Sequence, residues 1–122
     1  MILVDTSVWI DHLRTGDAEL ARLLDASRVL MHPFVLGELA CGNLRNRVEV
    51  LALLKDLPRT TVADDGEVLF FIERHALMGR GIGYVDTHLL AAAALEGSTR
   101  MWTRDKRLQM AADSLALAYD KD

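Results

Sequence analysis

Residues 2–10 read Ile-Leu-Val-Asp-Thr-Ser-Val-Trp-Ile, a short apolar run followed by polar residues and a second apolar group. The run at 2–4 predicts a strand that is buried on both faces of a sheet. Thr6 and Ser7 are residue types that cap helices, so we expect a helix to begin there. Asp5 therefore stands at the carboxyl end of the strand, directly before the helix.

The same succession of short strands and amphipathic helices continues along the chain. Further strands are expected at 29–31, 60–63, 100–103 and 115–118, and helices around Leu20 to Leu24 and at 33–41, 46–56, 66–78, 86–96 and 105–113. Strands that alternate with helices predict an α/β fold with an open parallel sheet covered on both faces. No linker or repeat interrupts the pattern, so residues 1–122 are expected to form a single domain.

Composition restricts the class of protein without identifying it. The sequence has no apolar run of the roughly 18 residues that a membrane span needs and no signal-peptide pattern, so we expect a cytoplasmic protein without membrane contact. Its single cysteine, Cys41, cannot form an internal disulfide and is expected to be a small buried residue. The formal net charge is −4. That charge neither supports nor excludes RNA binding, since four acids in one metal site would leave the remainder neutral.

Two aspartates follow predicted strands at equivalent places. Asp5 ends the first strand and Asp105 follows the strand 100–103. Ligands of open α/β sheets bind beyond the carboxyl ends of the strands, so both are candidate site residues. Each has an alternative interpretation as a helix N-cap. Thr103 can hydrogen-bond a neighbouring carboxylate and fix its orientation.

Two further acids lie on predicted helices. Glu38 is spaced at i+4 from Phe34 and three residues before Cys41, which places it on an apolar stripe of its helix. A carboxylate buried there needs a metal, a cation or several hydrogen bonds, although Glu38 can also lie at the edge of the stripe or pair with an Arg. Asp86 begins a helix, where its alternative role is a favourable charge in the first turn.

Taken together, the four acids are more informative than any one of them. If the first strand neighbours the strand 100–103, Asp5 and Asp105 meet at a point where the strand order reverses. A cluster of carboxylates repels itself and is stabilised by a divalent cation. Ligands that are all oxygen suit Mg²⁺ or Mn²⁺ better than Zn²⁺.

Four short motifs resemble those of PIN domains, and their order, spacing and total length resemble the VapC toxins of bacterial toxin–antitoxin pairs. They are Leu-Val-Asp-Thr-Ser-Val-Trp-Ile at 3–10, Gly37-Glu38-Leu39 with Gly42, Asp-Thr-His-Leu-Leu-Ala-Ala at 86–92, and Thr103-Arg104-Asp105. Each motif is weak alone, but the four in this order are specific, and the resemblance covers essentially the whole chain.

The resemblance implies a three-layer α/β/α sandwich with a central parallel sheet and Mg²⁺- or Mn²⁺-dependent cleavage of RNA. The catalytic, metal-binding positions of the family fall on Asp5, Glu38, Asp86 and Asp105, and its supporting hydroxyls on Thr6 and Thr103. It also implies a cognate antitoxin protein as partner. Apolar residues on the early helices (Trp9, Leu13, Leu20 and Leu24) are expected to help form a homodimer within a larger toxin–antitoxin complex.

Other functions stay open at this point. One is a catalytically inactive PIN-like module that binds RNA or protein. Another is a phosphotransfer receiver domain, which needs an Asp ending a middle strand, whereas the strand expected at 60–63 contains none. A metal-free ribonuclease would use histidines, but the four in the chain form no recognisable arrangement. Arg80 and Arg104 are candidate phosphate contacts near the acids.

Overall fold

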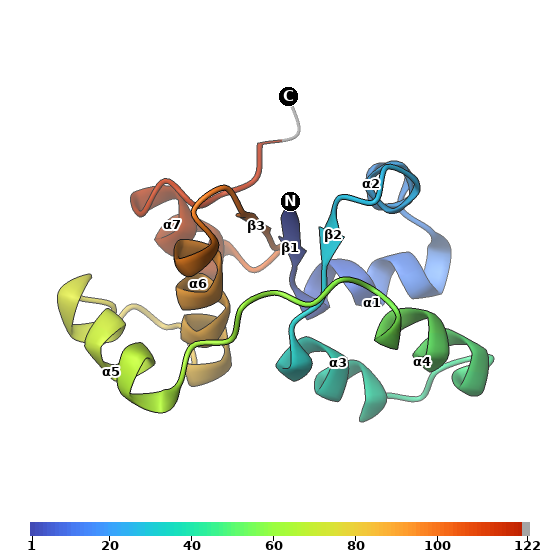
Figure 1. Ribbon diagram of the computed structural model, residues 1–122, viewed down its shortest axis with the longest axis horizontal. Coiled ribbons are helices and arrows are strands. Elements are labelled where there is room, and N and C mark those ends of the chain that lie inside the picture. Colours follow the sequence, from blue (N-terminus) through green and yellow to red (C-terminus); the bar gives the residue numbers. More distant parts are fainter. Residues whose placement is uncertain (121–122) are drawn as a thin grey trace.

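A three-stranded parallel sheet forms the middle of the molecule in the computed structural model, which describes residues 1–120 (Figure 1). Strand β1 (Ile2–Val4) is central, flanked by β2 (Val29–Leu30) and β3 (Arg100–Trp102). Leu3 is in register with Leu30 on one side and with Met101 on the other. The first strand therefore neighbours the strand at 100–102, which is the condition under which Asp5 and Asp105 were expected to meet.

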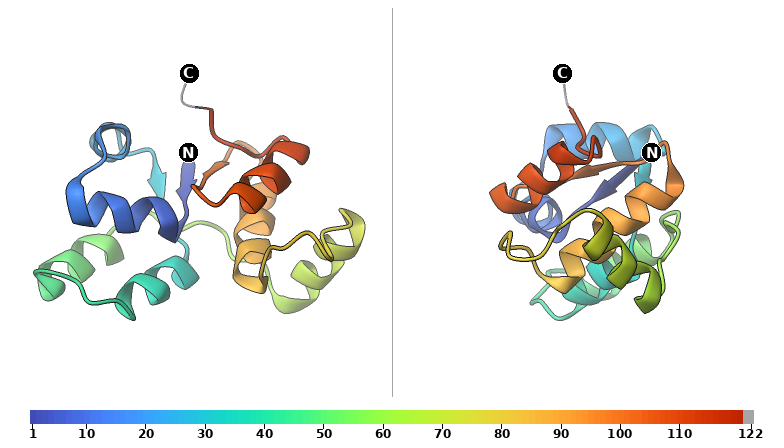
Figure 2. Two further views of the ribbon diagram at one scale, coloured as in Figure 1. Left: turned by 180° about the vertical axis from the view of Figure 1, so that it is seen from behind. Right: turned by 90° about the vertical axis from the view of Figure 1, so that its left-hand side faces the viewer.

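Helices cover both faces of this sheet, and the expected α/β/α sandwich is confirmed (Figures 1 and 2). Those in the described part are α1 (Thr6–Thr15), α2 (Ala18–Asp25), α3 (Pro33–Ala40), α4 (Arg47–Lys55), α5 (Asp65–Arg74), α6 (Tyr84–Glu96) and α7 (Lys106–Ser114). The first four helices lie on one side of the sheet and α5, α6 and α7 on the other. Helix α6, rich in Leu and Ala, has most of its length buried against the sheet.

The apolar residues of the early helices belong to the core. Trp9 and Leu20 are buried, and Leu13 and Leu24 pack against the same cluster. The expectation that these four side chains form a dimer surface is therefore wrong. These side chains are covered because α1 and α2 lie directly over the sheet. Val8, which is also on α1, is buried as well.

The strand expected at 60–63 is reduced to one bridge, between Met31 and Arg59. Thr60 donates its backbone N–H to Met31, but the next N–H, that of Thr61, donates to the Glu96 carboxylate at 2.7 Å. The pairing with this edge of the sheet therefore ends after the Met31–Arg59 bridge.

The strand expected at 115–118 is likewise one bridge, between Met101 and Ala118. The first two of these residues complete the end of α7 instead. Ala116 has φ +57°, and the Leu117 N–H then donates back to Ala112 at 2.9 Å. This left-handed turn closes the helix and leaves little chain to pair with β3.

The helix expected at 66–78 ends at Arg74. Ala76 has φ +51°, and the Leu77 N–H donates to the Ile72 carbonyl at 3.0 Å, which closes the helix end. Leu77 is buried beyond that end, so the apolar pattern continued after the helix had stopped. Other expected boundaries differ by one or two residues. No helix within residues 1–120 is long and apolar enough to cross a membrane.

Candidate active site

Asp5 is held at the carboxyl end of the central strand. Its backbone N–H donates to Trp102 at 2.9 Å, which ties it to β3. Its side chain is 7% exposed, and one oxygen, Oδ2, accepts hydrogen bonds from Ser7 and Thr103, both at 2.8 Å. Asp5 occupies the N-cap position of α1 but makes no side-chain capping bond. The hydroxyls of Thr6 and Ser7, expected to cap α1, lie within the helix and face other side chains.

Asp105 lies beside Asp5 because β1 and β3 are neighbouring parallel strands. Its backbone N–H donates to the Thr103 hydroxyl at 3.1 Å, so Thr103 connects the two aspartates. The Asp105 carboxylate accepts from the Leu108 N–H at 3.0 Å, which is the capping role considered as its alternative. One Asp105 oxygen thus caps α7, and the carboxylate still lies at the carboxyl edge of the sheet.

Glu38 is connected to β1 through α1, since the Thr6 hydroxyl donates to Glu38 Oε1 at 2.7 Å. The argument that Glu38 lies on a buried stripe is wrong. Helix α3 buries Val35 and Leu39, whereas Phe34, Glu38 and Cys41 are exposed. Cys41, expected to be buried, is an exposed free thiol. Glu38 nevertheless faces the first motif, because its helix packs against α1.

Asp86 is the half-buried member of the group and lies in the first turn of α6. This position agrees with its alternative interpretation as a favourable charge at the start of a helix. Its carboxylate accepts from the Gly83 N–H at 3.2 Å. Burial raises the pKa of Asp86, the Gly83 hydrogen bond partly offsets this, and the charges of Asp5, Asp105 and Glu38 raise the pKa further. Asp5, Asp105 and Glu38 therefore each lie near enough to Asp86 for their charges to act on its carboxylate.

Replacing Asp86 with Asn should raise the free energy of unfolding at neutral pH without metal. A raised carboxyl pKa means that ionisation costs the folded state more than the unfolded state. The cost is absent at pH values where both states are protonated, and it grows as pH rises to the raised pKa. Urea unfolding of Asp86→Asn and wild type, in chelator, should show the gain at neutral pH and its disappearance at acid pH. Asp25→Asn, at the exposed end of α2, is the matched control. A gain that persists at acid pH would show that ionisation is not its cause.

The donor set fits a hard divalent cation. All four side chains offer carboxylate oxygens, the ligands that Mg²⁺ and Mn²⁺ prefer, and a cation would relieve the repulsion at Asp86. As the side chains are placed, no group of three or more His, Cys, Asp or Glu among residues 1–120 encloses a metal position. One oxygen of Glu38 accepts from Thr6, and one oxygen of Asp105 accepts from the Leu108 N–H.

Sequence reasoning missed Ser7. Its hydroxyl donates to Asp5 and accepts the Arg104 N–H at 3.0 Å, so it fixes the loop after β3 against α1. The polar run after the first strand contained this signal, but it was interpreted as a cap. The Arg104 guanidinium forms ion pairs with Asp11 and Asp17. Its guanidinium is therefore engaged with two carboxylates, and its candidate role as a phosphate contact stays a prediction.

The histidines do not form an acid–base pair suited to a metal-free ribonuclease. Burial, and to a lesser extent His88, lowers the pKa of His32 to about 4. Its Nδ1 accepts from the Phe34 N–H at 3.0 Å, so His32 is a neutral cap of α3. His88 is buried, with the rings of Phe34 and Tyr84 at 4.7 and 4.6 Å. Both histidines are thus packed residues beside the acids.

Comparison with known proteins agrees with this geometry. The chain matches the PIN domain family over residues 2–114. It is 49% identical to Ribonuclease VapC32 of Mycobacterium tuberculosis, in strains CDC 1551 / Oshkosh and ATCC 25618 / H37Rv, over 100% of this chain and 98% of that protein. The crystal structure of FitAcB from Neisseria gonorrhoeae has a TM-score of 0.64 and 23% identity, covering 93% of this chain and 94% of that one. That likeness concerns the fold alone. The chain, with its parallel sheet and its acids gathered at the carboxyl edge, belongs to the PIN domain family.

Proposed function

We propose that this protein is an endoribonuclease that hydrolyses RNA phosphodiester bonds and is the toxin of a toxin–antitoxin pair. The observation that supports the proposal is that Asp86 lies near enough to Asp5, Asp105 and Glu38 for their charges to raise its pKa, in addition to the larger effect of burial. The full-length similarity to proteins named Ribonuclease VapC32 supports the same activity. We further propose that these four carboxylates hold Mg²⁺ or Mn²⁺.

Each residue has a role that follows from its contacts. Asp5 is the most firmly positioned ligand, because Ser7 and Thr103 hold one of its oxygens and leave the other available. Asp86, at the start of α6, completes the main pair. Glu38 and Asp105 complete the set directly or through water. A bound cation supplies positive charge that activates water for attack and offsets charge on the phosphoryl oxygens.

Arg107 is a better phosphate contact than the arginines expected from the sequence. Its side chain lies across Gly81 in the loop before α6, where a Cβ at Gly81 would come within 2.6 Å of it. Arg107 is exposed and is two residues from Asp105. Arg80, in the same loop, points to the far end of α7, where Ser114 lies at 3.4 Å. A guanidinium over the loop that leads to Asp86 is suited to hold an RNA phosphate there.

Cleavage should require Mg²⁺ or Mn²⁺ and disappear in excess chelator. The purified chain is incubated with end-labelled total RNA, with each metal, with EDTA, and with metal restored after EDTA. Asp25→Asn serves as a surface control that should cut like wild type. Mapping the cut ends in total RNA identifies the class of RNA and the site of cleavage.

Two outcomes would contradict parts of this proposal. Undiminished cutting in excess EDTA would exclude metal-dependent cleavage, but the proposed nuclease activity itself would stand. A folded protein that binds RNA but cuts none with either metal would be the inactive module instead. Restored activity on adding metal back supports the proposal as stated.

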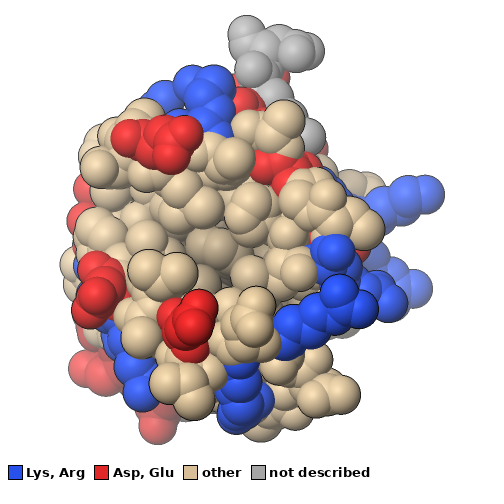
Figure 3. Space-filling view, turned by 90° about the vertical axis from the view of Figure 1, so that its right-hand side faces the viewer, with Lys and Arg blue, Asp and Glu red and all other residues tan. Residues whose placement is uncertain are grey.

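A groove on this chain, beside the four carboxylates, is suited to bind the antitoxin. A cavity of about 640 Å³ lies between α1, the end of α3 and α4, and Glu38 is part of its wall. Its lining is apolar at Ile10 and Leu13 and basic at Arg14 and Arg45. On the side of α1, α2 and α4, most basic side chains in view lie along the lower and right-hand edges of a surface made mostly of residues other than Lys, Arg, Asp and Glu (Figure 3). A segment bound in this groove would reach the carboxylates.

A basic antitoxin side chain is expected to inhibit by pairing with the carboxylates in place of metal. High Mg²⁺ should then partly relieve inhibition, because cation and side chain compete for one site. The purified toxin–antitoxin complex is titrated with Mg²⁺ while RNA cleavage is followed. If inhibition is insensitive to Mg²⁺ concentration although the complex is shown to bind metal, the antitoxin blocks RNA access instead.

A further inference from the structure

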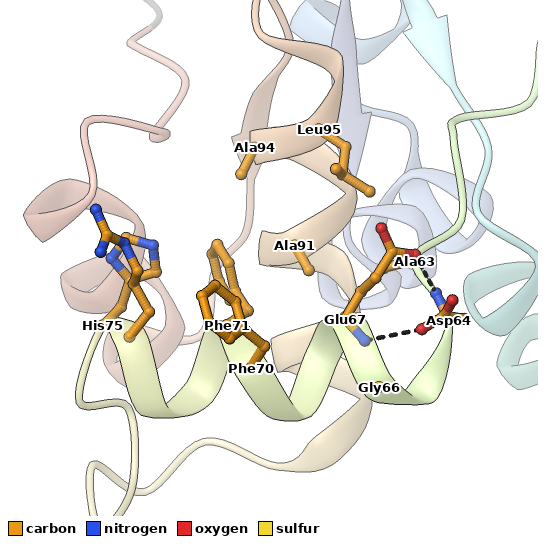
Figure 4. Close-up of a pocket in the computed structure, with 11 residues that line it drawn as sticks. Ala63, Asp64, Gly66, Glu67, Phe70, Phe71, His75, Ala91, Ala94 and Leu95 are labelled. Carbon is orange, nitrogen blue, oxygen red and sulfur yellow. Dashed lines mark hydrogen bonds between the residues drawn. The ribbon is translucent and has the colours of Figure 1, made fainter.

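Two exposed aromatic rings lie on the helices that carry Glu38 and Asp86. Phe34 is 37% exposed on α3, and Tyr84 is 47% exposed at the start of α6. A further exposed ring, that of Phe70, lies in a groove between α5 and α6 that none of the four acids lines (Figure 4). What distinguishes Phe34 and Tyr84 is therefore their position beside the acids, and not their exposure alone.

The buried side chain of His88 connects these two rings. The centroid of its imidazole is 4.7 Å from that of Phe34 and 4.6 Å from that of Tyr84, and both contacts are edge-to-face. Phe34 comes from α3 and Tyr84 from α6, so both helices contribute a ring to the same buried histidine. We refer to Phe34 and Tyr84, with His88 between them and the core, as the aromatic platform.

The fold holds both rings of the aromatic platform in place. The Tyr84 hydroxyl donates to the Asp65 carboxylate at 2.8 Å, and the Tyr84 carbonyl accepts from the Thr87 hydroxyl at 2.7 Å. Phe34 also contacts the buried ring of His32, at 5.0 Å between centroids. Rings that are already fixed lose little conformational freedom on binding, so stacking on them costs less than stacking on mobile side chains.

The aromatic platform is within one nucleotide of the acids. Phe34 is one helical turn before Glu38 on the exposed side of α3, and the Cβ atoms of residues so spaced are about 5–6 Å apart. Tyr84 is two residues before Asp86 at the start of α6. In RNA one ribose joins a base to its phosphate. A phosphate held at the acids therefore places a neighbouring base within reach of these rings.

We propose that Phe34 and Tyr84 form the binding site for one nucleobase of the RNA, next to the phosphodiester that is cut. This inference rests on the proposed nuclease function and adds two positioning residues to it. Aromatic side chains stack on bases that are splayed out of a single strand or loop, whereas the bases of a duplex are stacked on one another. Every base has a π-face, so the aromatic platform contributes affinity for single-stranded RNA whatever its sequence.

Fluorescence anisotropy with a labelled single-stranded RNA of randomised sequence, about 12 nucleotides long, measures this contribution. All proteins carry Asp5→Asn and are measured with Mg²⁺, so that the RNA is cut too slowly to interfere, and a denaturing gel checks that it is intact. Phe34→Leu and Tyr84→Leu keep an apolar side chain but remove the π-face, and each should weaken binding roughly tenfold. Tyr84→Phe keeps the ring and should bind like the Asp5→Asn parent. Binding to an RNA duplex of the same length should be weaker, and Tyr84→Leu should not change it.

Phe70→Leu is the matched control, because it makes the same change at a ring that is 69% exposed and lies away from the acids. Circular dichroism and sedimentation velocity check that each variant keeps the fold and the assembly of the parent. Equal RNA affinity of the parent, Phe34→Leu and Tyr84→Leu overturns the inference and leaves the nuclease proposal standing. Weaker RNA binding that accompanies a changed assembly assigns the rings to a protein contact, and it overturns the inference as well. A wild-type chain that neither binds nor cuts RNA overturns the proposed function and this inference with it.

Discussion

Replacing Asp5 with Asn should reduce RNA cleavage by roughly 10²–10³-fold while the protein stays folded. A bound cation contributes several kcal/mol to transition-state stabilisation, and loss of a main ligand removes much of it. The substitution is mild for the fold, because Ser7 and Thr103 both donate to the same oxygen, Oδ2. The amide oxygen of Asn can accept both bonds, which leaves the NH₂ group where the metal-binding oxygen was.

Single-turnover cleavage rates at saturating Mg²⁺, with circular dichroism as a check of folding, measure this effect. Asp25→Asn makes the same chemical change on the surface and should cut at the wild-type rate. Thr103→Val should give an intermediate loss of about 10–100-fold, because Thr103 positions Asp5 without touching the metal. Wild-type turnover by a folded Asp5→Asn protein would remove Asp5 from the site.

Replacing Trp9 with Ala should lower the free energy of unfolding by about 3–5 kcal/mol, the usual cost of deleting a large buried aromatic side chain. Trp9 is 2% exposed and lies on α1, four residues after Asp5. Its indole N–H is buried without a hydrogen-bond partner among the described residues. Trp9→Phe is therefore a sharp comparison, since it removes that N–H and keeps most of the ring volume, at a cost nearer about 1 kcal/mol.

Urea unfolding followed by far-ultraviolet circular dichroism measures both variants without relying on tryptophan fluorescence. Equal losses for Ala and Phe would mean that the indole N–H contributes to stability after all, through a water or another partner. A loss for Ala well below about 2 kcal/mol would mean that the cavity collapses and that α1 packs loosely on the sheet.

Local patterns were sufficient for the elements with strong periodicity. The apolar run at 2–4, the strand at 100–102 and the Leu- and Ala-rich α6 were all predictable, because each has a clear pattern of burial over its whole length. The equivalent places of Asp5 and Asp105 after their strands were also predictable, whereas the adjacency of β1 and β3 was only a condition that the structure then met. Residue type and position alone therefore indicated an acidic site at the carboxyl edge of a parallel sheet.

Tertiary contacts settled what periodicity could not. The pairing after Arg59 is limited to one bridge with Met31, and the Thr61 N–H donates to Glu96, a residue far away in sequence. The exposure of Glu38 depended on which side of α3 meets α1, and the apolar spacing pointed to the wrong side. Arg104 forms ion pairs because Asp11 and Asp17 come within its reach in the fold.

The difference has a physical cause. The spacing of buried residues repeats within a single helix or strand, so it can be recognised in a short stretch of sequence. Some partners of a carboxylate, a guanidinium or a backbone N–H lie tens of positions away, as in the 98-residue separation of Asp5 and Thr103. The local sequence pattern thus determines where the acids lie in each strand or helix. Packing between distant segments determines which hydroxyls, amides and cations contact them.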